Sequence, residues 1–239
     1  YKGQYHFRSG STKQELKGAA LDKFLLQKQG KRWDAVPVPH VSASDLSINA
    51  FDYFRNKAIK SNRLTEEILQ ESNETLLEKL HLTEGQYLKR AAILLFHPDP
   101  EKYVTGAFVK IGYFRTDDDL LFQDEIHGHL FEQVEKTLDL LLTKYLKAMI
   151  SYDGIQRIER LQFPEAALRE ALLNAIAHKD YSSGIPIQIS VYTDKIIFWN
   201  EGTLQEVHIK ATYHNQHSQY TLASKSPCSN TLTALVKVN

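Results

Sequence analysis

Three polar side chains recur at four-residue intervals in the C-terminal third of the chain: Glu170, Asn174 and His178. A carboxylate can polarise a water molecule, an amide oxygen can bind a hard cation, and an imidazole can act near phosphate. Spacing of four places all three on one face of a helix. Pro164 and Glu165 favour a helix N-terminus just upstream. The pattern therefore predicts one helix face suited to the phosphates of a nucleotide.

The opposite face of this helix is expected to face the core. Leu168, Leu172 and Ile176 also recur every four residues, and the polar row lies two residues away, which is about 200° around the helix. A plain solvent-facing row is the ordinary alternative, but Asn and His are weak helix formers. The positions between the polar residues are small or apolar: Ala171, Leu173, Ala175 and Ala177. We therefore expect the polar row to line a cleft.

An antiparallel hairpin is predicted to follow the helix. Residues 185–192 alternate between apolar and mostly polar side chains, residues 193–195 form a turn, and residues 196–199 return as a second strand. Asn200 and Gly202 end that second strand. A polar side chain next to a glycine would let the backbone approach a flat ligand closely.

This order of motifs resembles a known nucleotide-binding fold. A helix with Glu-x-x-x-Asn, a hairpin and Asn-x-Gly are similar to the GHKL fold of gyrase, histidine kinases and MutL. The stretch Ala-Leu-Arg-Glu-Ala-Leu-Leu-Asn-Ala-Ile-Ala-His-Lys-Asp-Tyr at 167–181 resembles more narrowly the C-terminal domain of bacterial RecG-related transcriptional regulators. Residues 5–11 look like the closing strand of their Schlafen/AlbA-like nucleic-acid-binding domain. Residues 88–100 resemble the middle segment of the same family.

The resemblance implies a role for each matching residue. Glu170 would stand where GHKL ATPases keep the carboxylate that polarises the attacking water. Asn174 would give a neutral oxygen to Mg²⁺, which bridges the phosphates of ATP. His178 would lie near the phosphates or order the lid. Asn200 would replace the aspartate that accepts from the adenine amino group, and Gly202 would match the glycine after it.

The sequence departs from the family pattern in ways that count against strong ATPase activity. An amide replaces the expected carboxylate at Asn200, Leu204 stands where ATPases of this fold have a second glycine, and Gln205 replaces a proline. Residues 206–239 lack the family's downstream motifs and show no clear period. We therefore expect an ATP-binding domain that is truncated or divergent after residue 205, with a weak or absent ATPase.

The expected fold class is α/β, of the α+β kind. It combines a GHKL-like sandwich of helices on an antiparallel sheet with a preceding helical and mixed α/β middle region. The domain prediction gives the end of the Schlafen/AlbA-like domain at 1–39, a middle domain at 40–158 and the ATP-binding domain at 159–239. The Pro-Val-Pro-His segment at 37–40 is the expected linker between the first two.

Several further elements are predicted from periodicity. Helices are expected near 14–27, 45–59 and 76–80, with a long one at 126–149. The apolar run 91–96 has the pattern of a strand buried on both faces, and the alternating run 107–114 is expected to pair with it. The acidic residues 117–119 fit a solvated turn. His127 and His129 lack enough neighbouring ligands for a zinc site.

Composition limits the partners and the compartment. Lys plus Arg equals Asp plus Glu at 29 each, so the whole chain gives no strong attraction to DNA or anionic lipid. Residues 1–39 carry eight basic and three acidic side chains, which suggests a phosphate-facing surface there, although a solvated helix face explains them equally well. The single cysteine, Cys228, fits a reducing compartment such as the cytoplasm. No apolar run approaches the roughly 20 residues of a membrane span.

Together these features predict a transcriptional regulator of the RecG-related type, a family named after a DNA helicase, with a degenerate ATP-binding domain. Its expected partners are ATP, Mg²⁺ and DNA, the last mainly through an N-terminal domain of which only the end is present. The pattern allows a homodimer and predicts no membrane partner. A catalytically silent dimerisation module and an active GHKL-type ATPase are the two alternatives.

Overall fold

The computed structural model describes residues 4–61, 67, 70–146, 148–153, 156–161, 163–202, 211–215, 218–224 and 231–238. The chain divides into two compact units, Tyr1–Leu94 and Leu95–Asn239. Helices combine with mostly antiparallel sheets, so the fold is of the α+β class, as the sequence predicts. Among the helices described, none has the length and apolar character needed to cross a membrane.

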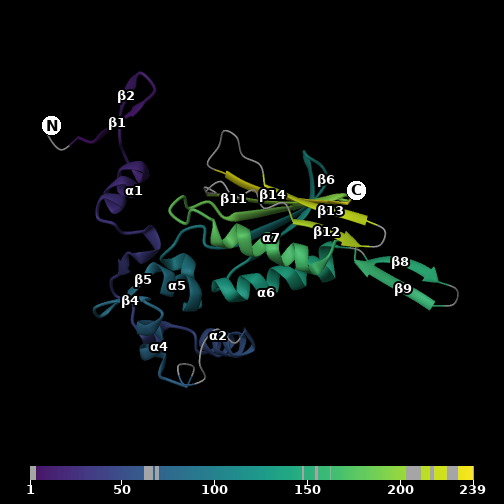
Figure 1. The fold of residues 1–239 in the computed structure, drawn as a ribbon, viewed down its shortest axis with the longest axis horizontal. Helices are drawn as coiled ribbons and strands as arrows, with labels where there is room; N and C mark the ends of the chain where they lie inside the picture. Colours follow the sequence, from purple (N-terminus) through teal and green to yellow (C-terminus); the bar gives the residue numbers. More distant parts are fainter. Residues whose placement is uncertain are drawn as a thin grey trace. The chain divides into compact units, whose positions relative to one another are not determined.

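The first unit contains short helices and two small sheets (Figure 1). Strands β1 and β2 form a hairpin, and β3, β5 and β4 form a three-stranded antiparallel sheet. The elements in chain order are β1 (His6–Ser9), β2 (Thr12–Glu15), α1 (Ala19–Lys28), η1 (Trp33–Ala35), β3 (Pro37–Val38), η2 (Ala43–Asp45), α2 (Ile48–Ser61), α4 (Asn73–Lys79), β4 (Thr83–Glu84), β5 (Tyr87–Lys89) and α5 (Arg90–Phe96), whose last residues enter the second unit.

The second unit is built on a seven-stranded sheet in the order β12-β13-β14-β11-β10-β6-β7. Only the β6–β10 pair is parallel among these neighbours. Its elements are η3 (Pro100–Lys102), β6 (Val109–Thr116), β7 (Asp119–Ile126), α6 (Leu130–Leu140), a π-helical turn η4 (Leu141–Tyr145), β8 (Ala148–Asp153), β9 (Gln156–Leu161), α7 (Glu165–Ala177), β10 (Ile187–Val191), β11 (Lys195–Glu201), β12 (Ala211–Asn215), β13 (Ser218–Ser224) and β14 (Thr231–Val238).

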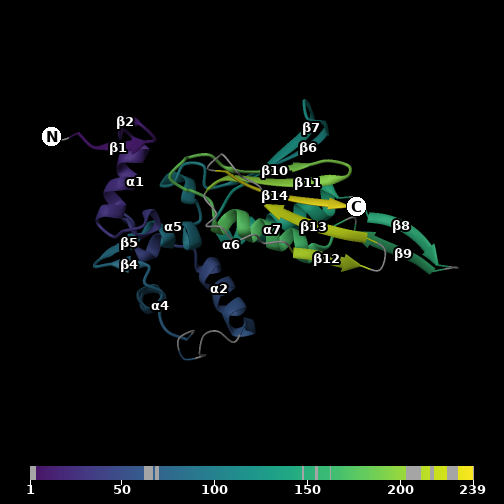
Figure 2. The same ribbon diagram turned by 45° about the horizontal axis from the view of Figure 1, so that its top comes forward.

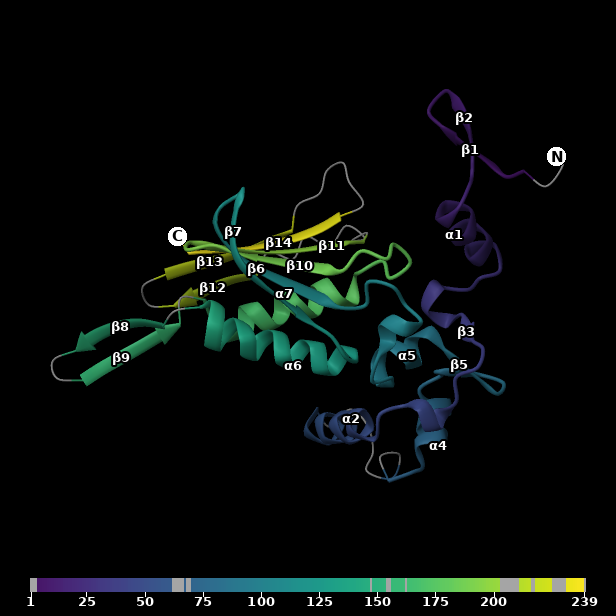
Figure 3. The same cartoon turned by 180° about the vertical axis from the view of Figure 1, so that it is seen from behind.

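Helices α6 and α7 lie side by side on one face of this sheet (Figures 1 and 3). Their apolar side chains meet those of β6, β10 and β11 in one continuous core. Across the sheet, Ile111, Ile189 and Phe198 are direct neighbours in register and all are buried. The hairpins β6–β7 and β10–β11 form four neighbouring strands at one end of the sheet, with β7 at the edge (Figure 2). Burial of this apolar surface is the main term that holds the helices on the sheet.

The expected core row of α7 is confirmed. Leu168 and Leu172 are fully buried and Ile176 nearly so. Ala167, Ala171 and Ala175 are buried as well, because small side chains let the helix approach its neighbours closely. Arg169 joins α7 to α6 through an ion pair with Glu135 at 3.2 Å.

The apolar run 91–96 is a helix, and the strand prediction for it is wrong. Ala and Leu are strong helix formers, and a short apolar run does not distinguish a buried strand from a buried helix. Helix α5 (Arg90–Phe96) buries Ala92, Ile93 and Phe96 completely. Consequently the 107–114 segment pairs with other partners: β6 lies between β7 and β10.

Two predicted helices are shorter than expected. Helix α6 begins at Leu130 because the His129 side chain accepts the Glu132 backbone N–H and caps the helix there. Ile126 belongs to β7 and Met149 to β8. Helix α1 begins at Ala19, after the β2 strand and Gly18 at φ +55°. In residues 206–239 the sequence shows no clear helical or strand periodicity, yet strand β14 in this part of the chain pairs antiparallel with β11.

A matched pair of substitutions tests the packing of α7. Leu172→Ala should lower the free energy of unfolding by about 2–5 kcal/mol, because the side chain is fully buried against the sheet. Leu173→Ala is the control, since the Leu173 side chain is 47% exposed, and it should change stability by about 0.5 kcal/mol or less. Urea unfolding followed by tryptophan fluorescence measures both. Equal effects would contradict the assigned orientation of α7.

Candidate functional site

The predicted polar row lies on α7 and runs past its end. Glu170 and Asn174 are half-buried, whereas His178 is exposed. His178 is the residue after the last helical position, and its backbone N–H donates to the Asn174 carbonyl at 3.1 Å. The row is therefore neither a fully solvated face nor part of the core.

The other predicted residues lie at the end of β11. Ile196, Phe198 and Asn200 alternate along the strand, and all three are buried, which places Asn200 on the helix-facing side of the sheet. Asn200 is 0% exposed. Its Oδ1 has no hydrogen-bond partner within the described part of the chain, and its Nδ2 donates only to the Glu201 carbonyl at 3.4 Å. Because about 90% of buried polar groups are paired, this amide is exceptional.

The end of α7 and the end of β11 meet at Gly202. A Cβ atom on Gly202 would collide with the His178 carbonyl and lie 3.1 Å from Asn200 Nδ2. The Asp180 backbone N–H donates to the Glu201 carbonyl at 2.6 Å, two residues beyond His178. The structure thus brings His178, Asn200 and Gly202 together, and only glycine fits at 202.

Glu170 lies at the far end of the same row. Eight residues separate it from His178, which is roughly 12 Å along a helix. Asn174 stands midway between them, one turn from His178. The row therefore ends at His178, whose backbone carbonyl lies against Gly202, and it leads away from there towards Glu170.

The structure adds Lys179, which the sequence pattern did not single out. Its side chain is buried, and its Nζ donates to the Ile185 carbonyl at 2.5 Å. The Tyr181 ring centroid lies 4.8 Å from the same nitrogen. Burial lowers the Lys179 pKa from its ordinary value to about 8, against the opposing influence of Asp180 and Glu201. A lysine just past a helix end is ordinarily solvated, so no sequence signal marks this one.

Tyr181, which is half-buried, lies beside Lys179. Its hydroxyl donates to the Ile176 carbonyl at 3.1 Å, and burial raises its pKa above the ordinary value for tyrosine. The Tyr181 side chain therefore connects the segment after α7 to the last turn of that helix.

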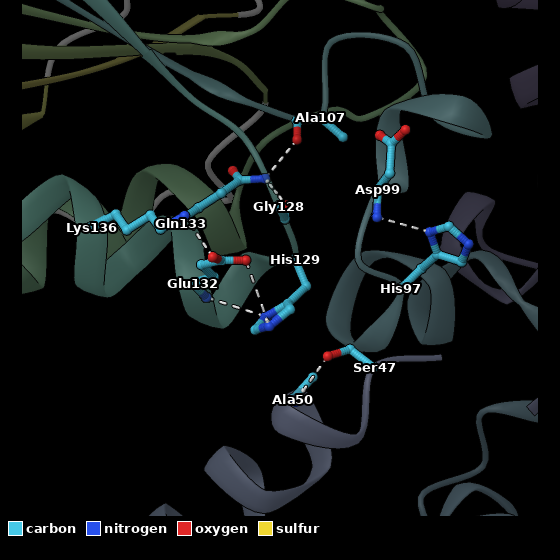
Figure 4. Close-up of polar contacts among 10 residues, drawn as sticks. All are labelled: Ser47, Ala50, His97, Asp99, Ala107, Gly128, His129, Glu132, Gln133 and Lys136. Atoms are coloured by element: carbon cyan, nitrogen blue, oxygen red, sulfur yellow. Dashed lines mark hydrogen bonds and ion pairs between the residues drawn. The ribbon is translucent and has the colours of Figure 1, made fainter. Parts of the chain in front are cut away.

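The histidines before α6 have structural partners (Figure 4). His129 caps α6 through Glu132, and His97 Nδ1 accepts the Asp99 backbone N–H at 3.0 Å. The buried Gln133 donates to the Ala107 and Gly128 carbonyls at 2.6 and 2.7 Å. His127 pairs with Glu101. Within the described ranges, no three His, Cys, Asp or Glu side chains are grouped for a metal ion.

Comparison with known proteins gives a structural likeness and no sequence relative. No protein-family model matches the sequence, and no curated protein matches it. The chain resembles the crystal structure of the DIP2311 protein from Corynebacterium diphtheriae, with a TM-score of 0.61 and 15% sequence identity. The match covers 100% of this chain and 54% of that one, so this chain spans about half of its length. At this identity the likeness supports the α+β fold alone.

The contact at Gly202 can be tested by one methyl group. Gly202→Ala should lower the free energy of unfolding by about 1–3 kcal/mol, because the added Cβ meets a backbone carbonyl that cannot rotate away. Asp194→Ala, at an exposed turn position of the same hairpin, is the control and should change stability by about 0.5 kcal/mol or less. Thermal unfolding of both variants decides the matter. An unchanged melting temperature for Gly202→Ala would rule out the close approach of α7 and β11.

Proposed function

We propose that the second unit binds ATP, together with Mg²⁺, as part of a nucleic-acid-linked transcriptional regulator resembling the RecG-related family. The single observation that carries the proposal is the buried Asn200 Oδ1, which has no hydrogen-bond partner among the residues that the structure describes. Such an acceptor costs free energy unless a donor from a ligand pairs with it. The exocyclic amino group of adenine is a donor of this kind.

The end of α7 lies close to the proposed base site at Asn200. Gly202 carries no side chain, and the α7 end stands directly against it. A base that pairs with Asn200 would lie near the end of α7, because the His178 carbonyl and the Asn200 amide both lie beside Gly202, and the rest of the nucleotide could then follow the α7 row. Base and phosphates would then occupy opposite ends of one helix face.

The α7 residues would act on the phosphate end. Asn174 is suited to give one neutral oxygen to Mg²⁺, which prefers oxygen ligands and usually keeps several waters. Its amide makes no hydrogen bond to any residue that the structure describes. Glu170, half-buried two turns before His178, could orient a water molecule. The amide in place of a carboxylate at 200 favours weak binding and weak or absent hydrolysis.

The first unit would supply the link to nucleic acid. The proposal places DNA contacts in residues 1–39, where basic side chains exceed acidic ones by five. A cytoplasmic location and possible pairing of two copies belong to the same proposal. A silent dimerisation module is the competing function, and it predicts no nucleotide binding.

Calorimetric titration of ATP separates these functions. Wild-type protein should bind ATP weakly and only with Mg²⁺, and Asn174→Ala should lose most of the dependence on Mg²⁺. Asn200→Leu should abolish binding while leaving the melting temperature equal or higher, since it removes a buried amide oxygen that has no partner among the described residues. Gln188→Leu, on the exposed side of the adjacent strand, should bind like wild type. No heat at millimolar ATP would end the ATP proposal in favour of the silent module.

Nucleic-acid binding is expected to be weak and dependent on salt. For a few phosphate contacts, log affinity for duplex DNA should fall with log salt at a slope of about 0.9 per contact. Arg8→Glu should weaken binding and reduce the slope, whereas Lys60→Glu, with the same charge change at an exposed position of α2, should not. A gel-shift series at several salt concentrations measures both. Tight binding that ignores salt would contradict the proposal.

A further inference from the structure

The Asn200 amide is closed off in this structure. It is the residue best suited to meet a ligand, yet it is 0% exposed. A ligand can reach it only if a covering segment moves. The covering segment must lie against the amide and be held by contacts that can break.

The segment Lys179–Ile185, hereafter the strap, lies against the amide. The Asp180 backbone N–H and the Asn200 Nδ2 donate to the same acceptor, the Glu201 carbonyl, at 2.6 and 3.4 Å. Two donors on one carbonyl must be close neighbours. The strap therefore begins immediately beside the amide that the ligand would need.

Lys179 closes the strap on itself. Its ammonium group reaches the Ile185 carbonyl, six residues further on, and lies against the Tyr181 ring. Both partners are neutral, and no carboxylate lies within 4 Å of this nitrogen in the described part of the chain. A buried ammonium without a paired anion opposes its own burial. The hydrogen bond from Lys179 to the Ile185 carbonyl closes the strap, and hydration of the ammonium group favours breaking it.

We propose that Lys179 is a positioning residue: its buried side chain holds the strap over the Asn200 amide, and its charge makes the strap open. The inference rests on the proposed function only for the identity of the ligand, ATP, that would reach Asn200. The opening itself is a property of this chain and can be measured without nucleotide.

The charge on Lys179 makes strap opening depend on pH. The charged groups that face it are Asp180 in the strap and Glu201 at the end of β11, and both favour the ammonium form. Burial outweighs them and lowers the pKa from 10.5 to about 8. The closed strap therefore binds the proton less tightly than the open strap. Rising pH favours closure, by about tenfold per pH unit between these two values.

Hydrogen exchange of the strap amides tests the proposal, with rates corrected for intrinsic exchange. Wild-type protection should rise about tenfold or more between pH 7.5 and pH 9.5. Lys179→Met should be protected at both pH values, because no charge is buried. Lys179→Arg should be poorly protected at both, because arginine stays charged. Lys195→Met is the matched control, since Lys195 also lies over a tyrosine ring, at 4.4 Å from Tyr192, but outside the strap; it should behave like wild type.

Two results would overturn the proposal. One is wild-type protection that does not change with pH while α7 stays protected. The other is lower strap protection in Lys179→Met than in wild type at pH 7.5, which would mean that the lysine only stabilises the closed strap and that its charge does not favour opening. ATP titration separates this inference from the function on which it draws. If wild type binds ATP, Lys179→Met should bind it more weakly by the factor of its added protection; if wild type binds none, the proposed function fails and the exchange result still stands.

Discussion

Close packing of α7 against the sheet is the constraint on which the rest of the second unit depends. The buried alanines at 167, 171 and 175 let the helix approach its neighbours, and Leu168 and Leu172 fill the space towards the strands. On the sheet side, Ile196 and Phe198 of β11 belong to the same buried core. Asn200 occupies the next position on that same face, where the pattern of the core would place an apolar residue. The candidate site is therefore a polar continuation of the core rather than a feature added to the surface.

The end of α7 explains why the site is so compact. The helix stops at His178, whose carbonyl lies against Gly202, and the chain then returns across the end of β11. Any larger residue at 202 would push the two elements apart. Three predicted residues and one that was not predicted, Lys179, meet within this small region because a single helix end determines where they lie.

Periodicity predicted the parts of this arrangement that depend on one element at a time. The core row of α7 and the β10–β11 hairpin follow from helical and strand spacing, and the structure confirms both. The run 91–96 is a helix where the sequence predicts a strand, because an apolar run without alternation fits either element. The burial of Asn200 and of Lys179 depends on contacts between separate segments. No local sequence pattern contains that information. The parallel pairing of β6 with β10 cannot be predicted from a local pattern either.

That parallel pair also has a consequence for how the chain folds. Val109 lies opposite Ile187, so the pairing joins residues 78 positions apart. Closing a loop of that length costs roughly 4 kcal/mol in chain entropy before the pairing contributes any stability. The hairpins β6–β7 and β10–β11 join close neighbours in sequence and have no such cost. We expect both hairpins to form early and the sheet to complete only when α6 and α7 are docked, so the late step of folding is the one that assembles the Asn200 site.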